Sequence, residues 1–251
     1  MNELVILFFL ITAFLTVVIG TVAGFGTSTI FLPVALLFVD FKTALVLVAI
    51  THLSGNVGAT TFFRHGLDRR LILLFGAPSI LLTILGAYLV IYIPQNILET
   101  ILGIFLLLFS VYSLLRPNFK VRAAKINTIA GGSLSGFLQG LVGIGGPLRG
   151  AFLISYNLEK FKYIATLAAI AVIIDATRIP IYFANNLLES QFFYYIPPLV
   201  IIGIVGSYTG KKIVGRIPQN IFKKIVLVGI ALASILLIYS GINQVIGQIF
   251  T

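Results

Sequence analysis

The residues of this chain that could take part in chemistry are few, and most of them interrupt long apolar stretches. Asp175 and Arg178 stand three positions apart in AVIIDATRIP, which places them on one face of a helix. Arg149 follows GIGGP by two positions, and His52 precedes Asn56 by one helical turn in THLSGN. No His, Asp and Glu cluster has the spacing of a metal site, and no nucleophile is paired with a base. These residue types favour binding of a charged ligand, without a metal or a cofactor, over catalysis by an enzyme.

The composition decides the environment in which these charges must lie. Of 251 residues, 59% are hydrophobic and only 10% are charged, against about 25% charged in a soluble protein. A soluble fold of this length would expose large apolar patches, so a soluble enzyme, a disordered chain and a nucleic-acid-binding protein are excluded. There are no cysteines, which excludes disulfides and thiolate chemistry. We expect an all-helical, multi-pass protein of the plasma membrane.

Each polar side chain at membrane depth has two explanations that the sequence leaves open. Asp175 and Arg178 could neutralise each other structurally, or form a gate or coupling site in which a substrate or a proton competes for one partner. Arg149 could bind an anion through its guanidinium, or extend to the interface. His52, with Asn56, could be a hydrogen-bonded packing residue or a proton relay.

Two glycine clusters, GTVAGFGTST from Gly20 and GFLQGLVGIGGPLRG from Gly136, predict interrupted helices. Glycine costs about 1 kcal/mol in a helix relative to alanine and proline about 3 kcal/mol. In lipid, unwound backbone survives only where it lines a cavity or is buried in protein. The amides that begin the next half-helix would then attract an anion. The predicted substrate-binding residues are Gly24, Phe25, Gly26, Thr27, Ser28, Gly143, Gly145 and Gly146, with Arg149 or Arg178 as counter-charge and His52, Asn56 and Asp175 in coupling or gating.

Other glycines have the spacing of close helix packing. Gly132, Gly136 and Gly140 lie four positions apart, as do Gly206 and Gly210. Small residues at this spacing let two helix backbones approach each other. We therefore expect a packing role for these five glycines.

The chain contains two copies of one unit. Gly24-Phe25-Gly26 matches Gly143-Ile144-Gly145 at an offset of 119, and IPQNI recurs identically at an offset of 124. The stretch APSILLTILGAY also matches PPLVIIGIVGSY at an offset of 120. The predicted units are residues 1–118 and 126–251, joined by a basic cytoplasmic linker at 119–125.

Each unit predicts a glycine-broken stretch followed by three membrane segments. The first stretch begins with a retained segment at about residues 4–22. Segments of about 20 apolar residues suit spanning helices. We expect them at 44–63, 71–93 and 97–115, and at 163–183, 192–214 and 225–246. A broken stretch counts as a re-entrant hairpin or as a pair of short spans, which gives eight to ten membrane segments in total.

The basic residues decide how the two units are oriented. Short cytoplasmic loops are enriched in Lys and Arg. If each broken stretch enters and leaves on one side, 14 basic residues share one face and Lys42 alone lies on the other. If each stretch crosses once, the two faces carry 7 and 8, which is no bias. The first arrangement makes the repeats inverted, with both termini outside.

Inverted repeats around a midplane site are typical of secondary transporters. We therefore expect transport of a small anion by alternating access, at a site between the two glycine-rich breaks. An anion-selective channel is the alternative. The expected partners are this anion and the lipid bilayer, without nucleic acid, and a homo-oligomer is compatible with the sequence.

The glycine-rich break with its downstream proline, GTVAGFGTSTIFLP, its counterpart GFLQGLVGIGGP and the loop FFRHG-x-D resemble the TauE/SafE sulfite exporter-like family of membrane permeases. The resemblance covers nearly the whole chain. It implies transport of small sulfur-containing anions such as sulfite, sulfonates or sulfoacetate, driven by an ion gradient. Asp175 could couple protons, so a proton is the expected coupling ion. The resemblance points to the breaks at residues 24–28 and 143–146. The first half has GFGTS in place of the fuller GxGGG-type pattern.

Overall fold

The computed structural model describes residues 3–23, 26–62, 66–117, 121–213, 216 and 218–249, and over these it is all-helical, without strands. In this part of the chain seven helices are long and apolar enough to cross a membrane. They are α1 (Glu3–Ala23), α3 (Phe41–Phe62), α4 (Arg69–Tyr92), α5 (Gln95–Leu115), α8 (Lys160–Ala184), α9 (Ile196–Ile213) with the preceding 3-10 helix η2 (Ser190–Tyr195), and α10 (Gln219–Ile249). The expected fold class, a multi-pass α-helical membrane protein, is confirmed.

The remaining helices adjoin the predicted breaks, and both breaks are present. They are α2 (Thr27–Ala35), α6 (Lys125–Val142), α7 (Gly146–Leu153) and the 3-10 helix η1 (Ile154–Tyr156). Gly26, before α2, has φ 86°, and Gly143, after α6, has φ 74°. Glycine adopts these left-handed angles without the clash that a Cβ would cause. Pro147 lies in the first turn of α7, where its missing N–H costs nothing.

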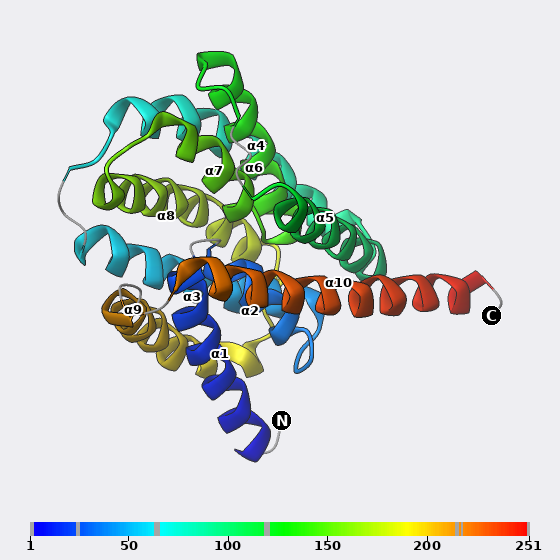
Figure 1. Cartoon of the computed structure of the whole chain (residues 1–251). Coiled ribbons are helices and arrows are strands. Elements are labelled where there is room, and N and C mark those ends of the chain that lie inside the picture. The colour runs from blue at the N-terminus through cyan, green and yellow to red at the C-terminus, as the bar shows by residue number, and fades with distance from the viewer. Residues whose placement is uncertain are drawn as a thin grey trace.

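The helices of one half pair with those of the other in a symmetric pattern (Figure 1). The helix α4 packs on α6, and its counterpart α9 packs on α1. Likewise α3 packs on α9 while α8 packs on α4. Equivalent helices meet each other as α3 with α8, α5 with α10 and α2 with α7. Two copies of one unit related by a two-fold axis would pair in this way. Their opposite orientation across the membrane stays a prediction.

Small residues bring α6 against α4 along its whole inner face. A Cβ added to Gly132 would lie 2.3 Å from the Phe75 carbonyl oxygen, and one added to Gly136 would lie 2.3 Å from that of Ser79. The hydroxyl of Ser79 donates a hydrogen bond to the Gly132 carbonyl at 2.9 Å, across the same contact. Together these contacts hold the two backbones closer than any larger side chain would permit.

Glycines also allow close packing between α9 and α1. A Cβ on Gly206 would lie 2.7 Å from Cγ1 of Val17, and one on Gly210 would lie 2.7 Å from Cβ of Thr21. The expected packing role of the two glycine runs is therefore confirmed in both places.

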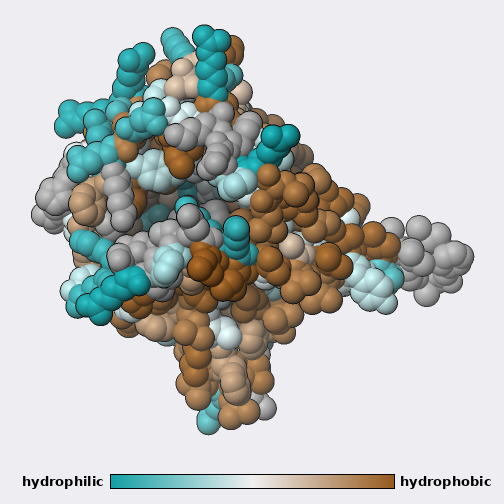
Figure 2. Space-filling view, viewed as in Figure 1, coloured by the Kyte–Doolittle hydropathy of each residue, from teal (hydrophilic) through white to brown (hydrophobic). Residues whose placement is uncertain are grey.

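The surface separates an apolar region from a polar one (Figure 2). Hydrophobic residues cover the lower and right parts of the view, where α1, α5 and α10 lie. Large apolar side chains such as Leu73, Leu108 and Leu236 are exposed to the surroundings of the protein. Hydrophilic residues gather at the upper left, around a hollow near the starts of α4 and α8 and the end of α9. An exposed apolar surface of this extent suits lipid.

The close contact of α6 with α4 generates a prediction about stability. Replacement G136A should lower the free energy of unfolding by about 1–3 kcal/mol, because the added methyl group forces the two backbones apart. The measurement is the thermal unfolding midpoint of the purified protein in detergent.

Gly229 on α10 provides the matched control, because a Cβ there has open space within 4 Å. The G229A protein should unfold at or slightly above the wild-type temperature. Equal midpoints for the two variants would contradict the packing role of Gly136.

Candidate functional site

The interruption of the first half lies directly against that of the second. A Cβ placed on Gly26 would be 3.6 Å from the Cα of Gly146 and 3.6 Å from Nε2 of His52. The short helices α2 and α7, which follow the two breaks, are also in contact. Among the described residues, the backbone of the two breaks therefore lies against protein or beside a cavity, as unwound backbone at membrane depth must.

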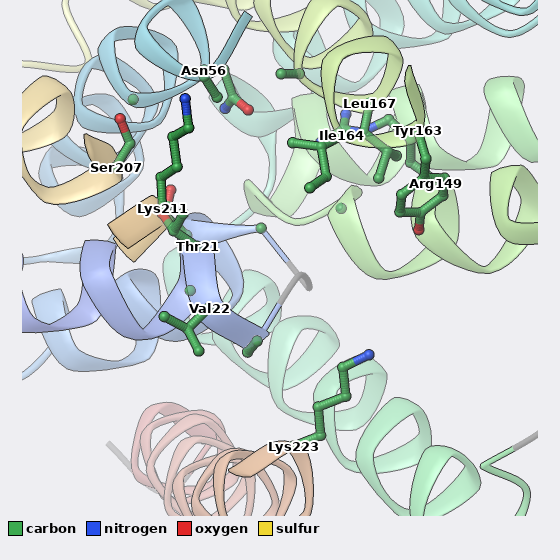
Figure 3. A pocket seen from close by; sticks show the side chains of 18 residues that line it. Thr21, Val22, Asn56, Arg149, Tyr163, Ile164, Leu167, Ser207, Lys211 and Lys223 are labelled. Carbon is green, nitrogen blue, oxygen red and sulfur yellow. The ribbon is translucent and has the colours of Figure 1, made fainter. Parts of the chain in front are cut away.

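A cavity of about 300 Å³ opens beside these breaks, between helices of both halves (Figure 3). Gly26 and Thr27 contribute the first break to its wall, and Gly146 contributes the second. The other lining residues are Gly20, Thr21, Val22, Ala23, Gly55, Asn56, Ala59, Arg149, Tyr163, Ile164, Leu167, Ala168, Ser207, Lys211 and Lys223. The cavity thus joins an apolar wall to a small set of polar groups, which is typical of a ligand site.

Arg149 is the buried cation of this cavity. It lies in the first turn of α7, where its backbone N–H donates to the Gly145 carbonyl at 3.0 Å, and its residue is only 3% exposed. Its side-chain Nε and Nη1 have no hydrogen-bond partner, and no carboxylate of the described residues lies within ion-pair distance. Unpaired buried charged donors are costly, so this guanidinium has capacity for an acceptor from outside the chain.

The charge of the cavity wall is positive. Lys211 and Lys223 line it together with Arg149, and none of its lining residues is acidic. Lys211 also donates to the Phe62 carbonyl at 2.9 Å, which ties the end of α9 to the end of α3. Figure 3 shows Arg149 and Lys211 on facing sides of the cavity and Lys223 across from both. A cleft lined by one sign of charge concentrates ions of the other sign.

The second break is held open by side chains of α6 and α8. Oε1 of Gln139 accepts a hydrogen bond from the Gly145 amide at 2.6 Å, and the Ser135 hydroxyl donates to the Gly145 carbonyl at 2.8 Å. Nη1 of Arg178 donates to the Gln139 carbonyl at 3.0 Å. These bonds replace the helical partners that the break removes. A Cβ on Gly145 would lie 2.3 Å from the Ser135 carbonyl oxygen, so this position requires glycine.

The first break differs from the second in having a buried hydroxyl group without a hydrogen-bond partner. Ser28 is fully buried, and its Oγ has no hydrogen-bond partner. Gly20 lets the end of α1 approach the start of α2, since a Cβ there would lie 2.6 Å from the Cα of Thr27. Gly24 and Phe25, two of the predicted binding residues, lie outside the described residues.

A buried network of charged residues joins the two halves behind the cavity. Nδ1 of His52 on α3 lies 2.6 Å from Oδ2 of Asp175 on α8. Oδ1 of Asp175 accepts from Nε of Arg178 at 2.9 Å and lies 2.8 Å from its Nη2. None of the three residues is more than 1% exposed. Mutual pairing is what makes such charges tolerable at this depth.

The structure divides the predicted site residues into two groups. Gly26, Thr27, Asn56, Gly146 and Arg149 line the cavity. Gly143, Gly145, Ser28, His52, Asp175 and Arg178 lie behind its wall. Arg178, expected as an alternative counter-charge, is instead engaged by Asp175 and the Gln139 carbonyl. Arg149 lies inside the protein rather than along its surface.

Several residues of the site were not predicted from the sequence, among them Lys211, Lys223 and Gln139. Lys211 and Lys223 were counted only as topology signals, because their loop reads as a basic cytoplasmic turn. Gln139 was included only within a glycine cluster. As a polar residue of an otherwise apolar and small-residue stretch, GFLQGLVG, it offered a signal that would have found it.

The comparison with known families agrees with this arrangement. The family model of the Sulfite exporter TauE/SafE matches residues 9–237, which is nearly the whole chain. No curated protein and no solved structure matches the chain. Seven apolar helices and a match of this length agree with the expected resemblance, and the chain belongs to the sulfite exporter TauE/SafE family of membrane transporters.

Proposed function

We propose that this protein transports small sulfur-containing anions, such as sulfite or sulfonates, through the cavity beside the two breaks. The observation that carries the proposal is Arg149, a buried guanidinium with two unpartnered donors in a cavity whose lining residues include no acid. A guanidinium matches the geometry of an oxyanion with its fixed fork of donors. The family supports sulfur-containing anions as the substrate class.

The size of the cavity supports a small substrate. Its volume of about 300 Å³ lies at the lower end of the range of about 300–1,000 Å³ for ligand pockets. Thr21, Asn56 and Ser207 add side-chain hydroxyl and amide groups to the wall. The hydroxyls of Thr21 and Ser207 already donate to backbone carbonyls of their own helices. We therefore infer that the amide of Asn56 and the ammonium of Lys211 bind the anion oxygens that Arg149 leaves unpaired.

Alternating access is supported by the difference between the two ends of α9. At one end, Lys211 lines the cavity. Directly before the other end, in η2, Tyr195 packs edge-on against Phe9, with ring centroids 5.7 Å apart, and Phe9 also contacts Phe31 and Phe38. We infer that the pathway is open on the side of the breaks that carries Lys211 and closed by this aromatic packing on the other side. A transporter would exchange these two states by rocking one unit against the other, whereas a channel would need both ends open.

Inverted repeats, formed by residues 1–118 and 126–251 and joined at 119–125, are part of the proposal. The loops predicted to be cytoplasmic make contacts with one another: Nζ of Lys162 lies 3.5 Å from Oδ2 of Asp68, and Lys211 bonds to Phe62. Basic loops gathered at one end of the molecule favour a single cytoplasmic face. Both termini would then lie outside the plasma membrane.

The role of Arg149 is tested by R149Q. The loss of a buried charge that bonds the anion should weaken binding by at least about 30-fold, the equivalent of 2 kcal/mol. The measurement is the concentration dependence of labelled-sulfite uptake into reconstituted vesicles, which should shift to higher sulfite concentration in R149Q. The matched variant R116Q removes an exposed guanidinium at the end of α5 and should transport at the wild-type rate. Wild-type transport by R149Q would refute the proposed site, and flux without counterflow exchange would indicate a channel.

The first break is tested by G26V. The branched side chain would stand between Gly146 and His52 and block the meeting of the two breaks, so transport should be lost. Gly66 also has a positive φ, 99°, but open space around its Cβ position. The G66V control therefore also places a branched residue at a positive φ, without filling the space between the breaks, and should retain transport. Equal loss in both variants would assign the effect to strain alone.

The orientation of the repeats is tested by single cysteines in this cysteine-free chain. In intact cells, a membrane-impermeant maleimide should label E3C but not R116C, and permeabilised cells should label both. The reason is that an odd number of crossings separates the two positions in the inverted arrangement. Labelling of both positions in intact cells would contradict it.

A further inference from the structure

His52 lies between the buried charge network and the first break, and its two ring nitrogens face different surroundings. Nδ1 lies 2.6 Å from the Asp175 carboxylate. An ionised carboxylate only accepts hydrogen bonds, so Nδ1 carries the ring proton. In the neutral imidazole, Nε2 then keeps a free lone pair.

The free nitrogen lies directly behind the cavity wall, next to Gly26. Nε2 lies 3.6 Å from the place where a Cβ of Gly26 would stand, and Gly26 itself lines the cavity. The missing side chain of Gly26 therefore leaves the lone pair of His52 separated from the cavity only by glycine backbone. Asn56, one turn further along α3, lines the cavity and donates to the His52 carbonyl at 2.7 Å.

We propose that Nε2 of His52 binds one proton for each anion that enters the cavity, so that proton and anion cross the membrane together. The inference rests on the proposed anion transport. The proton comes from water in the cavity and reaches the Nε2 lone pair past the backbone of Gly26, and it returns to water when the anion leaves on the other side. Nδ1 keeps its own proton and its bond to Asp175 throughout.

The charges around His52 explain why the two binding events support each other. One carboxylate faces the ring, and its charge is already shared with a guanidinium. The other titratable and charged groups of the network and of the cavity wall are cationic or neutral. They are Arg178 and Tyr182 of α8 in the network, and Arg149 of α7, Tyr163 of α8, Lys211 of α9 and Lys223 of α10 in the wall. Without an anion these cations oppose a second positive charge on the imidazole. A bound anion removes that opposition, and by linkage a proton on Nε2 strengthens the binding of the anion.

The net charge that moves depends on the anion. A monoanion accompanied by one proton crosses without net charge. A dianion accompanied by one proton carries one negative charge, which the membrane potential of a cell drives outward. A proton site of this kind is therefore compatible with export as well as with uptake.

The test counts protons as the anion binds. Isothermal titration of the detergent-purified protein with methanesulfonate, in buffers of different ionisation enthalpy, reports the protons taken up per anion. A sulfonate stays ionised between pH 5.5 and 8, so any pH dependence belongs to the protein. Wild-type protein should take up protons and should bind about tenfold more tightly at the lower pH.

Two matched variants assign the proton to one residue. The H52Q protein should bind methanesulfonate without proton uptake and with an affinity that does not change with pH. His65 is the other histidine of the chain, and H65Q should keep the wild-type behaviour with His52 as its one histidine. In vesicles, an outward methanesulfonate gradient should raise the lumenal pH with wild-type and H65Q protein, and H52Q should exchange the anion without this change.

Each other outcome overturns the inference. Anion binding by the wild type without proton uptake would reject the proton site and leave the proposed transport intact. Loss of coupling in H65Q would reject His52, whether or not H52Q inserts into the membrane. If sulfite binds and methanesulfonate does not, the wild-type proton count with sulfite should exceed that of H52Q, because sulfite's own ionisation contributes equally to both; equal counts would reject the site. Absence of any anion binding or flux would reject the proposed function and this inference with it.

Discussion

The structure depends on one constraint: backbone N–H and C=O groups that leave a helix cannot be exposed to lipid. Two glycine-rich breaks at membrane depth each release such groups. The fold meets this constraint by placing the breaks against each other, with Gly26 next to Gly146, and by bracing the second with Ser135 and Gln139. The pairing of equivalent helices around them, α3 with α8 and α2 with α7, follows from this central contact.

Burial at membrane depth also carries a free-energy cost for every charged side chain. The buried charges of this protein have two kinds of surroundings. Asp175 is shared between His52 and Arg178, so this network is internally compensated. Arg149 has no such partner among the described residues and faces a cavity that carries further positive charge. The ion-paired network of Asp175 joins the two halves. The guanidinium of Arg149 has no partner of opposite charge and therefore favours the binding of an anion. His52 belongs to the network and also lies next to Gly26 at the cavity wall, so it adjoins both groups of charges.

Periodicity and composition were sufficient for the elements. Apolar stretches of spanning length predicted α3, α4, α5, α8, α9 and α10 to within a few residues at most ends, because lipid permits few alternatives to a continuous helix. The glycines predicted both breaks, and α7 begins within the second cluster at Gly146, because Pro147 is favoured in a first turn. Spacing alone could not reveal that Gln139 braces the second break, because its partner amide depends on how the chain turns after α6.

The sequence by itself determined that this is a membrane protein with two related halves, because local apolarity, glycine spacing and repeated motifs are properties of the chain read in order. Only the tertiary structure decided which polar groups meet. His52 and Asp175 are 123 positions apart and come into contact because α3 crosses α8. Lys211 reaches the cavity wall because α9 packs on α1 and α3. Long-range packing sets these distances, and no local pattern encodes them.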